Sequence, residues 1–282
     1  MSLMTLSANS LTLCFRLVSG RWKVKKVIIA PIKGVGSGVV YSSEQLTEEE
    51  KNALALKALP YGGNWTHFFG AECLKKVNWN DQVVLSLTFV STQEDDFTRQ
   101  GTLHSRVLVI PFADYLDAIR GGALAIRQRF QKEFSHLTHF LPDDFSQILD
   151  LLSRADLEAV KTHRLTQRQI ARIAFDLKHH RRALVTDAYA DSKRWIAVEQ
   201  AILDILQSLP QGEMSQITFT TFALSPQDPS DIVALPQQII ADSVPVYITP
   251  IGTHQVARPV MATLGRLVED ILFWILQLFR SV

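Results

Sequence analysis

The sequence has only two cysteines, almost no net charge and no long uncharged apolar run. Cys14 and Cys73 lie far apart and match no metal-ligand spacing, so we expect two buried thiols in a reducing compartment rather than a disulfide. The formal net charge of +1 gives no overall field to attract nucleic acid or an acidic membrane. No stretch reaches the roughly 18 apolar residues of a transmembrane helix. Because the run 11–18 is interrupted by Arg16, it differs from a secretory signal, and we expect a cytoplasmic protein.

The sequence also lacks a nucleotide-binding signature. The glycine-rich stretch 34–38 is followed by Val39, Val40 and Tyr41, whereas a phosphate-binding loop needs a Lys-Ser or Lys-Thr pair and a helix directly after it. A dinucleotide fingerprint needs a third glycine that opens a helix. We therefore expect a turn or bulge between two strands here, with phosphate binding as the alternative, and no cofactor.

What is present is the composition of a folded globular protein, with 47% apolar and 20% charged residues among 282. The patterns predict an α+β fold with a mixed, mostly antiparallel sheet, a helical middle region and a C-terminal amphipathic helix. We expect a β-rich part over 1–113, a helical part over 114–212, returning strands of the same globule over 213–253 and the C-terminal helix over 254–282.

The strands are predicted from β-branched and aromatic runs. A first hairpin is expected to end at Pro31, and a further strand, expected inside the sheet, follows Pro210. A last strand is expected near a sheet edge, after an irregular loop containing Pro226, Pro229 and Pro236. The runs are 11–17, 22–29, 83–90, 107–110, 217–224 and 244–251.

The helices are predicted from apolar residues at helical spacing and from capping residues. The sequence Thr47-Glu48-Glu49-Glu50 has the form of a capping box, and its helix is expected to run to Pro60. Gly121-Gly122 is expected to break the helical run that begins at Asp114. Gln211-Gly212 is expected to form a turn. Other expected helices cover 143–152, 165–177 and 195–209.

An aromatic-rich loop covers residues 61–70. Its large side chains Tyr61, Trp65 and Phe68 are candidates for partner binding, because rigid scaffolds often present binding groups on loops. The alternative is that such side chains are buried in the core of the protein itself.

A polar cluster lies between two strand-like runs, in Asp95-Asp96-Phe97-Thr98-Arg99-Gln100-Gly101-Thr102-Leu103-His104-Ser105-Arg106. If it enters a strand, His104 and Arg106 point to the same face. A histidine beside acids can act as a general base and arginine can bind an anion, so Asp96, Arg99, His104 and Arg106 are catalytic candidates for hydrolysis. The alternative is an ordinary turn in which Asp96 and Arg99 pair, since no nucleophile signature accompanies the cluster.

The C-terminal segment 264–280 carries apolar residues along one face of a predicted helix. We expect that face to be covered by its own domain, by a protein partner or second copy, or by peripheral contact with a membrane. The residues proposed for partner binding here are Leu267, Ile271, Trp274, Ile275 and Leu278.

Two weaker patterns concern nucleic acid and metal. The stretch 165–171 loosely resembles the entry of a DNA-reading helix, but the charge balance of the chain does not favour nucleic-acid binding. His136 and His139 are spaced by one helical turn, yet no third ligand follows at a defined spacing, so we expect no metal site.

The order of these motifs resembles the N-terminal domains of GTPase-associated proteins from bacterial conflict systems. The residues that carry the resemblance are Gly36, Gly38, Asp95, Arg99, Gly101, His104, Leu209-Pro210 and Phe219-Thr220-Thr221. The resemblance implies an adaptor or sensor-like module that works with an NTPase or effector, and it brings no catalytic mechanism.

Two hypotheses about function result. The first is a non-enzymatic interaction module, a regulatory or recognition subunit of a bacterial defence or signalling assembly. The second is a hydrolase that acts on a phosphate-bearing or nucleotide-like substrate through the His/Asp/Arg cluster.

Overall fold

The structure is a computed structural model, and the description below is confined to part of the chain. The strand expected at 11–17 and the helix expected at 143–152 lie outside that part. The described residues are 24–32, 36–63, 65–91, 101–137, 140, 165–179, 183–187, 195–225, 227–236 and 248–251.

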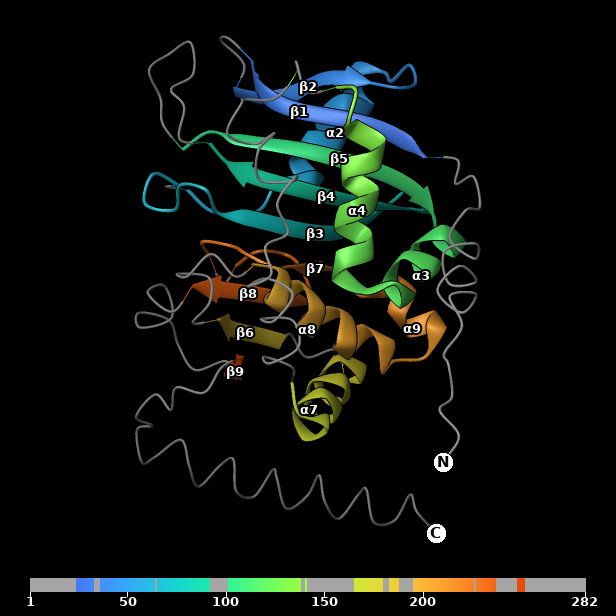
Figure 1. The fold of residues 1–282 in the computed structure, drawn as a ribbon, viewed down its shortest axis with the longest axis vertical. Helices are drawn as coiled ribbons and strands as arrows, with labels where there is room; N and C mark the ends of the chain where they lie inside the picture. Colours follow the sequence, from blue (N-terminus) through green and yellow to red (C-terminus); the bar gives the residue numbers. More distant parts are fainter. Residues whose placement is uncertain are drawn as a thin grey trace, which may run out of the picture. The chain divides into compact units, whose positions relative to one another are not determined.

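Nine strands of the described residues form one mixed sheet, which confirms the α+β class (Figure 1). Neighbouring strands are antiparallel from β2 to β7 and parallel from β7 to β9. The sheet is thus mostly antiparallel, and β7 lies inside it, as expected, where an antiparallel half meets a parallel half. In spatial order the strands are β2 (Gly36–Ser42), β1 (Lys25–Ile32), β5 (Leu103–Pro111), β4 (Gln82–Val90), β3 (Glu72–Trp79), β7 (Phe219–Thr220), β8 (Ile232–Pro236), β6 (Ala183–Asp187) and β9 (Ile248–Ile251).

Strands β1 and β2 pair as an antiparallel hairpin with a bulge, so the expectation of a turn or bulge between two strands is confirmed. Val40 is the extra residue of the bulge, because Tyr41 pairs with Ile28 and Val39 with Ile29. Strand β1 continues through Pro31, so the expectation that this proline ends the strand is wrong. The backbone of Lys26 forms its hydrogen bond on the side of β2. Because successive residues of a strand direct their backbone groups to opposite sides, the nitrogen of Pro31 faces β5. Pairing with β5 has already ended there, and no hydrogen bond is lost.

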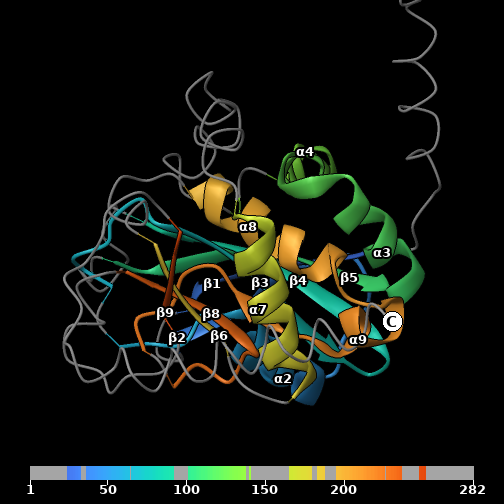
Figure 2. The ribbon, with the colours of Figure 1, turned by 90° about the horizontal axis from the view of Figure 1, so that it is seen from below.

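Helices lie on both faces of the sheet (Figure 2). Side chains alternate between the two faces of each strand. Leu85 and Leu108 pack on the face covered by several helices, and Val84 and Val109 pack on the face covered by one. The helix α2 (Glu48–Ala58) covers the second face. The first face carries α3 (Phe112–Arg120), α4 (Gly122–Phe134), α7 (Gln167–Lys178) and α8 (Trp195–Gln207).

Two of these helices begin with the capping boxes that satisfy their free N–H groups. In α2 the Glu50 N–H donates to Thr47 Oγ1 (3.2 Å) and the Thr47 N–H to Glu50 Oε2 (2.8 Å). This confirms the predicted start of α2, and Thr166 caps α7 in the same way with Gln169. Gly121-Gly122 separates α3 from α4 as expected, and Gly122 has a φ of 75° that disfavours other residues.

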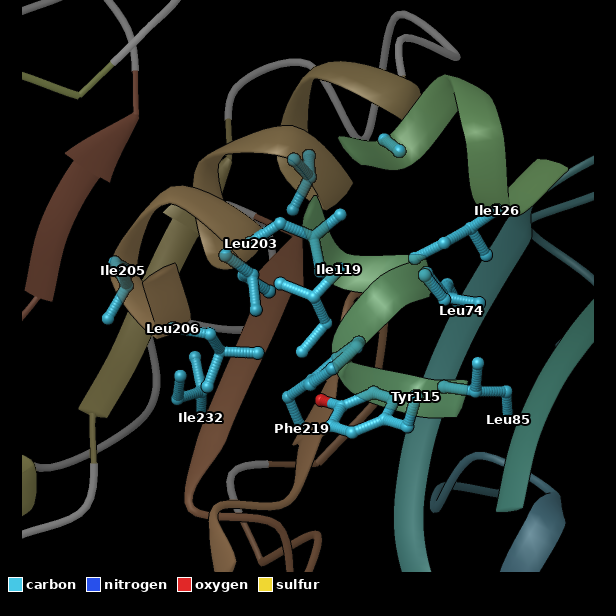
Figure 3. Close-up of a cluster of buried hydrophobic side chains, with 14 of the residues drawn as sticks. Leu74, Leu85, Tyr115, Ile119, Ile126, Leu203, Ile205, Leu206, Phe219 and Ile232 are labelled. Atoms are coloured by element: carbon cyan, nitrogen blue, oxygen red, sulfur yellow. The ribbon is translucent and has the colours of Figure 1, made fainter. Parts of the chain in front are cut away.

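The largest hydrophobic core lies between the sheet and the helices of the first face (Figure 3). Leu203 and Leu206 of α8 and Ile119 of α3 point into it, where Tyr115 lies beside Phe219. This core takes side chains from both halves of the sheet, including Leu74 and Leu85 of the antiparallel half and Phe219 and Ile232 near the parallel half. Each such side chain contributes about 1.5–3 kcal/mol on burial, so the two halves form one folded unit.

Several local expectations need correction. Strand β3 and strand β6, the latter within the part expected to be helical, were not predicted. A short helix, α9 (Gln211–Gln216), replaces the expected turn at Gln211-Gly212. The strand expected at 217–224 is only β7, and β8 lies inside the expected proline loop. Strand β9 lies at the sheet edge, as expected.

The chain divides into two compact units, 1–252 and 253–282. All elements above belong to the first unit. The predicted C-terminal amphipathic helix, 254–282, lies outside the described residues.

Candidate functional site at one end of the sheet

Strand β5 places the last part of the predicted polar cluster. His104 and Arg106 share the face of β5 that also carries Leu108, as alternation predicts, and this face is covered by helices. His104 is half-buried and Arg106 is buried. Residues 95–100 of the cluster lie outside the described residues, and these include Asp95, Asp96 and Arg99.

Both side chains contact neighbours of their own chain. His104 Nε2 lies 3.2 Å from Thr102 Oγ1, a distance at which a proton can pass between imidazole and hydroxyl. The guanidinium of Arg106 lies over the ring of Phe134 of α4, 6.0 Å from its centroid. Arg106 is therefore packed beneath a helix, whereas His104 is partly open to solvent.

A second buried arginine joins two helices to the sheet. Arg127 of α4 donates from Nε and Nη2 to both carboxylate oxygens of Glu199 of α8 (2.7 and 2.6 Å), and it forms an ion pair with Glu72 of β3. Burial disfavours its charge, but the carboxylates of Glu199 and Glu72 outweigh that effect and raise its pKa. This network fixes the position of α4 and α8 over the sheet.

Lys76 is fully buried on the same face. Its Nζ donates to the carbonyls of Ser215 (2.6 Å) and Ile217 (2.7 Å) and lies 5.3 Å from the centre of the Tyr115 ring. Burial lowers the pKa of Lys76 to about 7, against a smaller opposing effect of Asp231. The amine thus holds the end of α9 against β3.

Lys75, the preceding residue, lies on the opposite face with a carboxylate partner. Its Nζ lies 3.5 Å from Asp228 Oδ2 and donates to the Leu59 carbonyl (2.8 Å), and both charged side chains are almost fully buried. Asp228 Oδ2 also accepts the Tyr61 N–H (3.1 Å), and Oδ1 accepts the Ser230 N–H (2.9 Å). The pair therefore links β3 to the loop after α2 and to the loop before β8.

Cys73 is a free, buried thiol, as the sequence predicts for a cysteine without a partner. Its Sγ lies 3.1 Å from Thr220 Oγ1. Burial raises its pKa to about 11, so the thiolate that a cysteine nucleophile needs is disfavoured. Within the described ranges, no group of three or more His, Cys, Asp or Glu side chains is placed to hold a metal ion.

The aromatic loop presents its three candidate side chains differently. Trp65 is 6% exposed and Phe68 is half-buried, and their rings pack against Phe222 with centroids 5.9 and 5.4 Å away. Tyr61 is 51% exposed. Of the three side chains predicted to bind a partner, Tyr61 therefore offers the largest free surface, and Trp65 offers almost none.

The structure brings the aromatic loop and the polar cluster to the same end of the sheet. Gly101 has a φ of 73°, and a Cβ there would lie 3.0 Å from the Thr66 nitrogen, so the two loops approach closely. Strands β8 and β6 also end on this side, where their arrowheads point left in Figure 1. The carboxyl ends of parallel strands are a common place for ligand sites.

Sequence reasoning missed Leu56, Lys75 and Asp228. Leu56 belongs to α2 and is 82% exposed. The burial of Lys75 and Asp228 depends on a contact between distant segments, which no local pattern reveals. The C-terminal candidates lie outside the described residues, namely Leu267, Ile271, Trp274, Ile275 and Leu278.

No protein-family model, curated protein or solved structure matches the chain. Among the described helices, none is both long and apolar enough to cross a membrane. The resemblance to GTPase-associated proteins therefore enters the functional argument only as a proposal.

Proposed function

We propose that this chain is a non-enzymatic protein-interaction module. Its role would be that of a regulatory or recognition subunit in a bacterial multi-protein defence or signalling assembly, as the resemblance to GTPase-associated proteins implies. The surface proposed to bind a partner comprises the side chains of Leu56 and Tyr61, and is called the Leu56–Tyr61 surface below. The apolar residues of the C-terminal segment are proposed as a second contact, with a partner or with another copy.

The exposure of Leu56 and Tyr61 is the observation that carries this proposal. The side chain of Leu56 lies on the solvent side of α2 and is 82% exposed. That of Tyr61, in the loop that follows α2, is 51% exposed. Across the described residues, the other large apolar side chain that is counted as exposed is Val40, at 36%. The two residues are five positions apart in the sequence, and tyrosine is enriched among residues that dominate binding energy.

The buried charges support the same proposal. Arg127, Lys75 and Lys76 all bind groups of their own chain and join separate elements, and the pKa of the Cys73 thiol is raised. These groups serve the fold, since none of them is free to face a substrate. The described polar groups therefore favour a structural scaffold over a catalytic centre.

Affinity recovery from the native host tests the proposal. The tagged wild-type chain is expected to recover a partner protein at a constant molar ratio to the chain. Tyr61→Ala is expected to reduce that recovery about tenfold, because a binding residue of this kind contributes more than about 1.4 kcal/mol to the binding free energy. Arg120→Ala is the control, because Arg120 is exposed on α3 and pairs only locally with Asp117. Equal recovery by all three proteins would contradict the assignment of the surface.

The alternative proposal is a hydrolase for a phosphate-bearing or nucleotide-like substrate. It is supported by the His104–Thr102 contact, which lies at the same end of the sheet as the carboxyl ends of β8 and β6, although β4, β3 and β7 lie between. Changing His104 and Arg99 together to Ala should abolish release of phosphate from nucleotides if this proposal is correct. Under the interaction proposal the same variant alters only stability or partner recovery.

A further inference from the structure

The segment that carries Tyr61 is fixed from two sides by groups that lie beneath it. The Leu59 carbonyl accepts a hydrogen bond from Lys75 Nζ (2.8 Å), and the Tyr61 N–H donates to Asp228 Oδ2 (3.1 Å). Pro60 lies between these two contacts and has a restricted φ. Because Lys75 and Asp228 also pair with each other, one buried ion pair holds the backbone immediately before and at Tyr61.

The other side of the segment contacts the chain after β7. The Leu224 N–H donates to the Tyr61 carbonyl (3.2 Å). Gly62 has a φ of 143°, and a Cβ at that position would lie 2.5 Å from Leu224 Cβ. Both backbone groups of Tyr61 are thus bonded inward, while its side chain projects to solvent at 51% exposure.

A side chain held in this way binds at a lower entropic cost than one on a free loop. We propose that Asp228 is a positioning residue for the Leu56–Tyr61 surface, acting through the Lys75–Asp228 pair on the backbone of Leu59 and Tyr61. Asp228 is 0% exposed, so it lies beneath the surface that it would position. The inference rests on the proposed function for its biological meaning, but the mechanical role of Asp228 is measurable without a partner.

Amide hydrogen exchange of the full chain tests the positioning role. In Asp228→Ala the Tyr61 amide loses its acceptor, and the amides of Tyr61 and Gly62 are expected to exchange about tenfold faster relative to those of α8. Asp117→Ala, which removes an exposed carboxylate from a local pair on α3, should leave the ratio unchanged. A ratio in Asp228→Ala equal to that of the wild type would overturn the proposal.

A second variant covers the case in which Asp228→Ala does not fold. Changing Lys75→Met together with Asp228→Leu replaces both charges by apolar side chains of similar size, which is often tolerated. The Leu59 carbonyl and the Tyr61 N–H lose their partners in this variant as well. The same rise in the exchange ratio is expected, and its absence in a folded double variant would overturn the proposal.

Cross-linking separates this inference from the proposed function. A benzophenone amino acid in place of the neighbouring exposed Lys57 of the tagged chain is expected to capture a host protein, with about tenfold less product in Asp228→Ala and in Tyr61→Ala. If the wild type gives no product, the proposed function fails while the exchange result still decides the role of Asp228. If Asp228→Ala speeds exchange but captures as much as the wild type, Asp228 does not position the surface for binding.

Discussion

Lys75 and Lys76 are adjacent on β3, yet the two faces of the sheet treat their charges differently. Lys75 lies beneath the loop after α2 and has a carboxylate partner in Asp228. Lys76 lies beneath the helices of the other face, and its amine meets two carbonyls and the ring of Tyr115. A carbonyl offsets only part of the cost of burying a charge. The comparison teaches that burial alone does not decide whether a charge stabilises the fold. The charge of Lys75 is compensated by a carboxylate, whereas the charge of Lys76 is destabilised by its burial.

The largest effect is expected at Arg127, a buried cation with two carboxylate partners. Changing Arg127→Met leaves Glu72 and Glu199 buried without the cation, and it should lower the free energy of unfolding by about 5 kcal/mol. Denaturation by urea measures the change. A loss below about 1 kcal/mol would show that paired charges on this face contribute no more than exposed ones.

The next largest effect is expected when Lys75 loses its carboxylate. Asp228→Ala should destabilise the protein by about 3–4 kcal/mol, because a buried ammonium is left without its counter-ion. Lys75→Met combined with Asp228→Leu should restore most of that loss. If the double variant is as unstable as the single one, the damage comes from packing and not from the unpaired charge.

Lys76 should respond in the opposite direction. Lys76→Met removes a buried amine whose pKa is lowered to about 7, and after the loss of two hydrogen bonds it should still stabilise the protein at pH 7 by about 1–2 kcal/mol. Between pH 7 and 10.5 the unfolded chain binds more protons at Lys76 than the folded chain, so wild-type stability rises by up to about 1.4 kcal/mol per pH unit relative to the variant. Urea denaturation of both proteins at pH 7, 8.5 and 10 tests the sign, and a constant difference would contradict it.

The smallest effect concerns Tyr115, the aromatic neighbour of Lys76. Its hydroxyl is buried with no hydrogen-bond partner among the described residues, and burial raises its pKa. Tyr115→Phe removes this polar atom and should stabilise the protein by about 1 kcal/mol. A rise in Tm is the expected outcome, whereas a fall would indicate that the hydroxyl has a partner.

The sequence predicts the local parts of this fold well. The capping box at Thr47, the glycine break at Gly121-Gly122 and the end of α8 before Pro210 all depend on residues a few positions apart. Strand β6 was missed because five residues between a basic cluster and an acidic-polar stretch carry no clear period. The two residues of β7 are likewise too few to mark the limits of a strand.

The site is less predictable, because its contacts join distant segments. Alternation correctly placed His104 and Arg106 on one face, but it gave no sign that α4 covers Arg106. The aromatic loop was recognised from composition, whereas its division into inward Trp65 and outward Tyr61 follows from the position of Phe222. The local sequence around Asp228 is that of an ordinary loop, and only the folded structure shows its ion pair with Lys75.

The order of strands also has a consequence for synthesis. Strand β3 meets its outer neighbour only after the ribosome has added the segment around Thr221, whose hydroxyl accepts the Leu74 N–H across 147 residues of chain. Until then β3 is an edge strand of the first half of the sheet, and the backbone N–H and C=O groups on its outer side are unpaired. Contacts of such long separation slow folding. During translation, the emerging chain therefore passes through a stage in which β3 is open to association with other nascent polypeptides or to capture by chaperones.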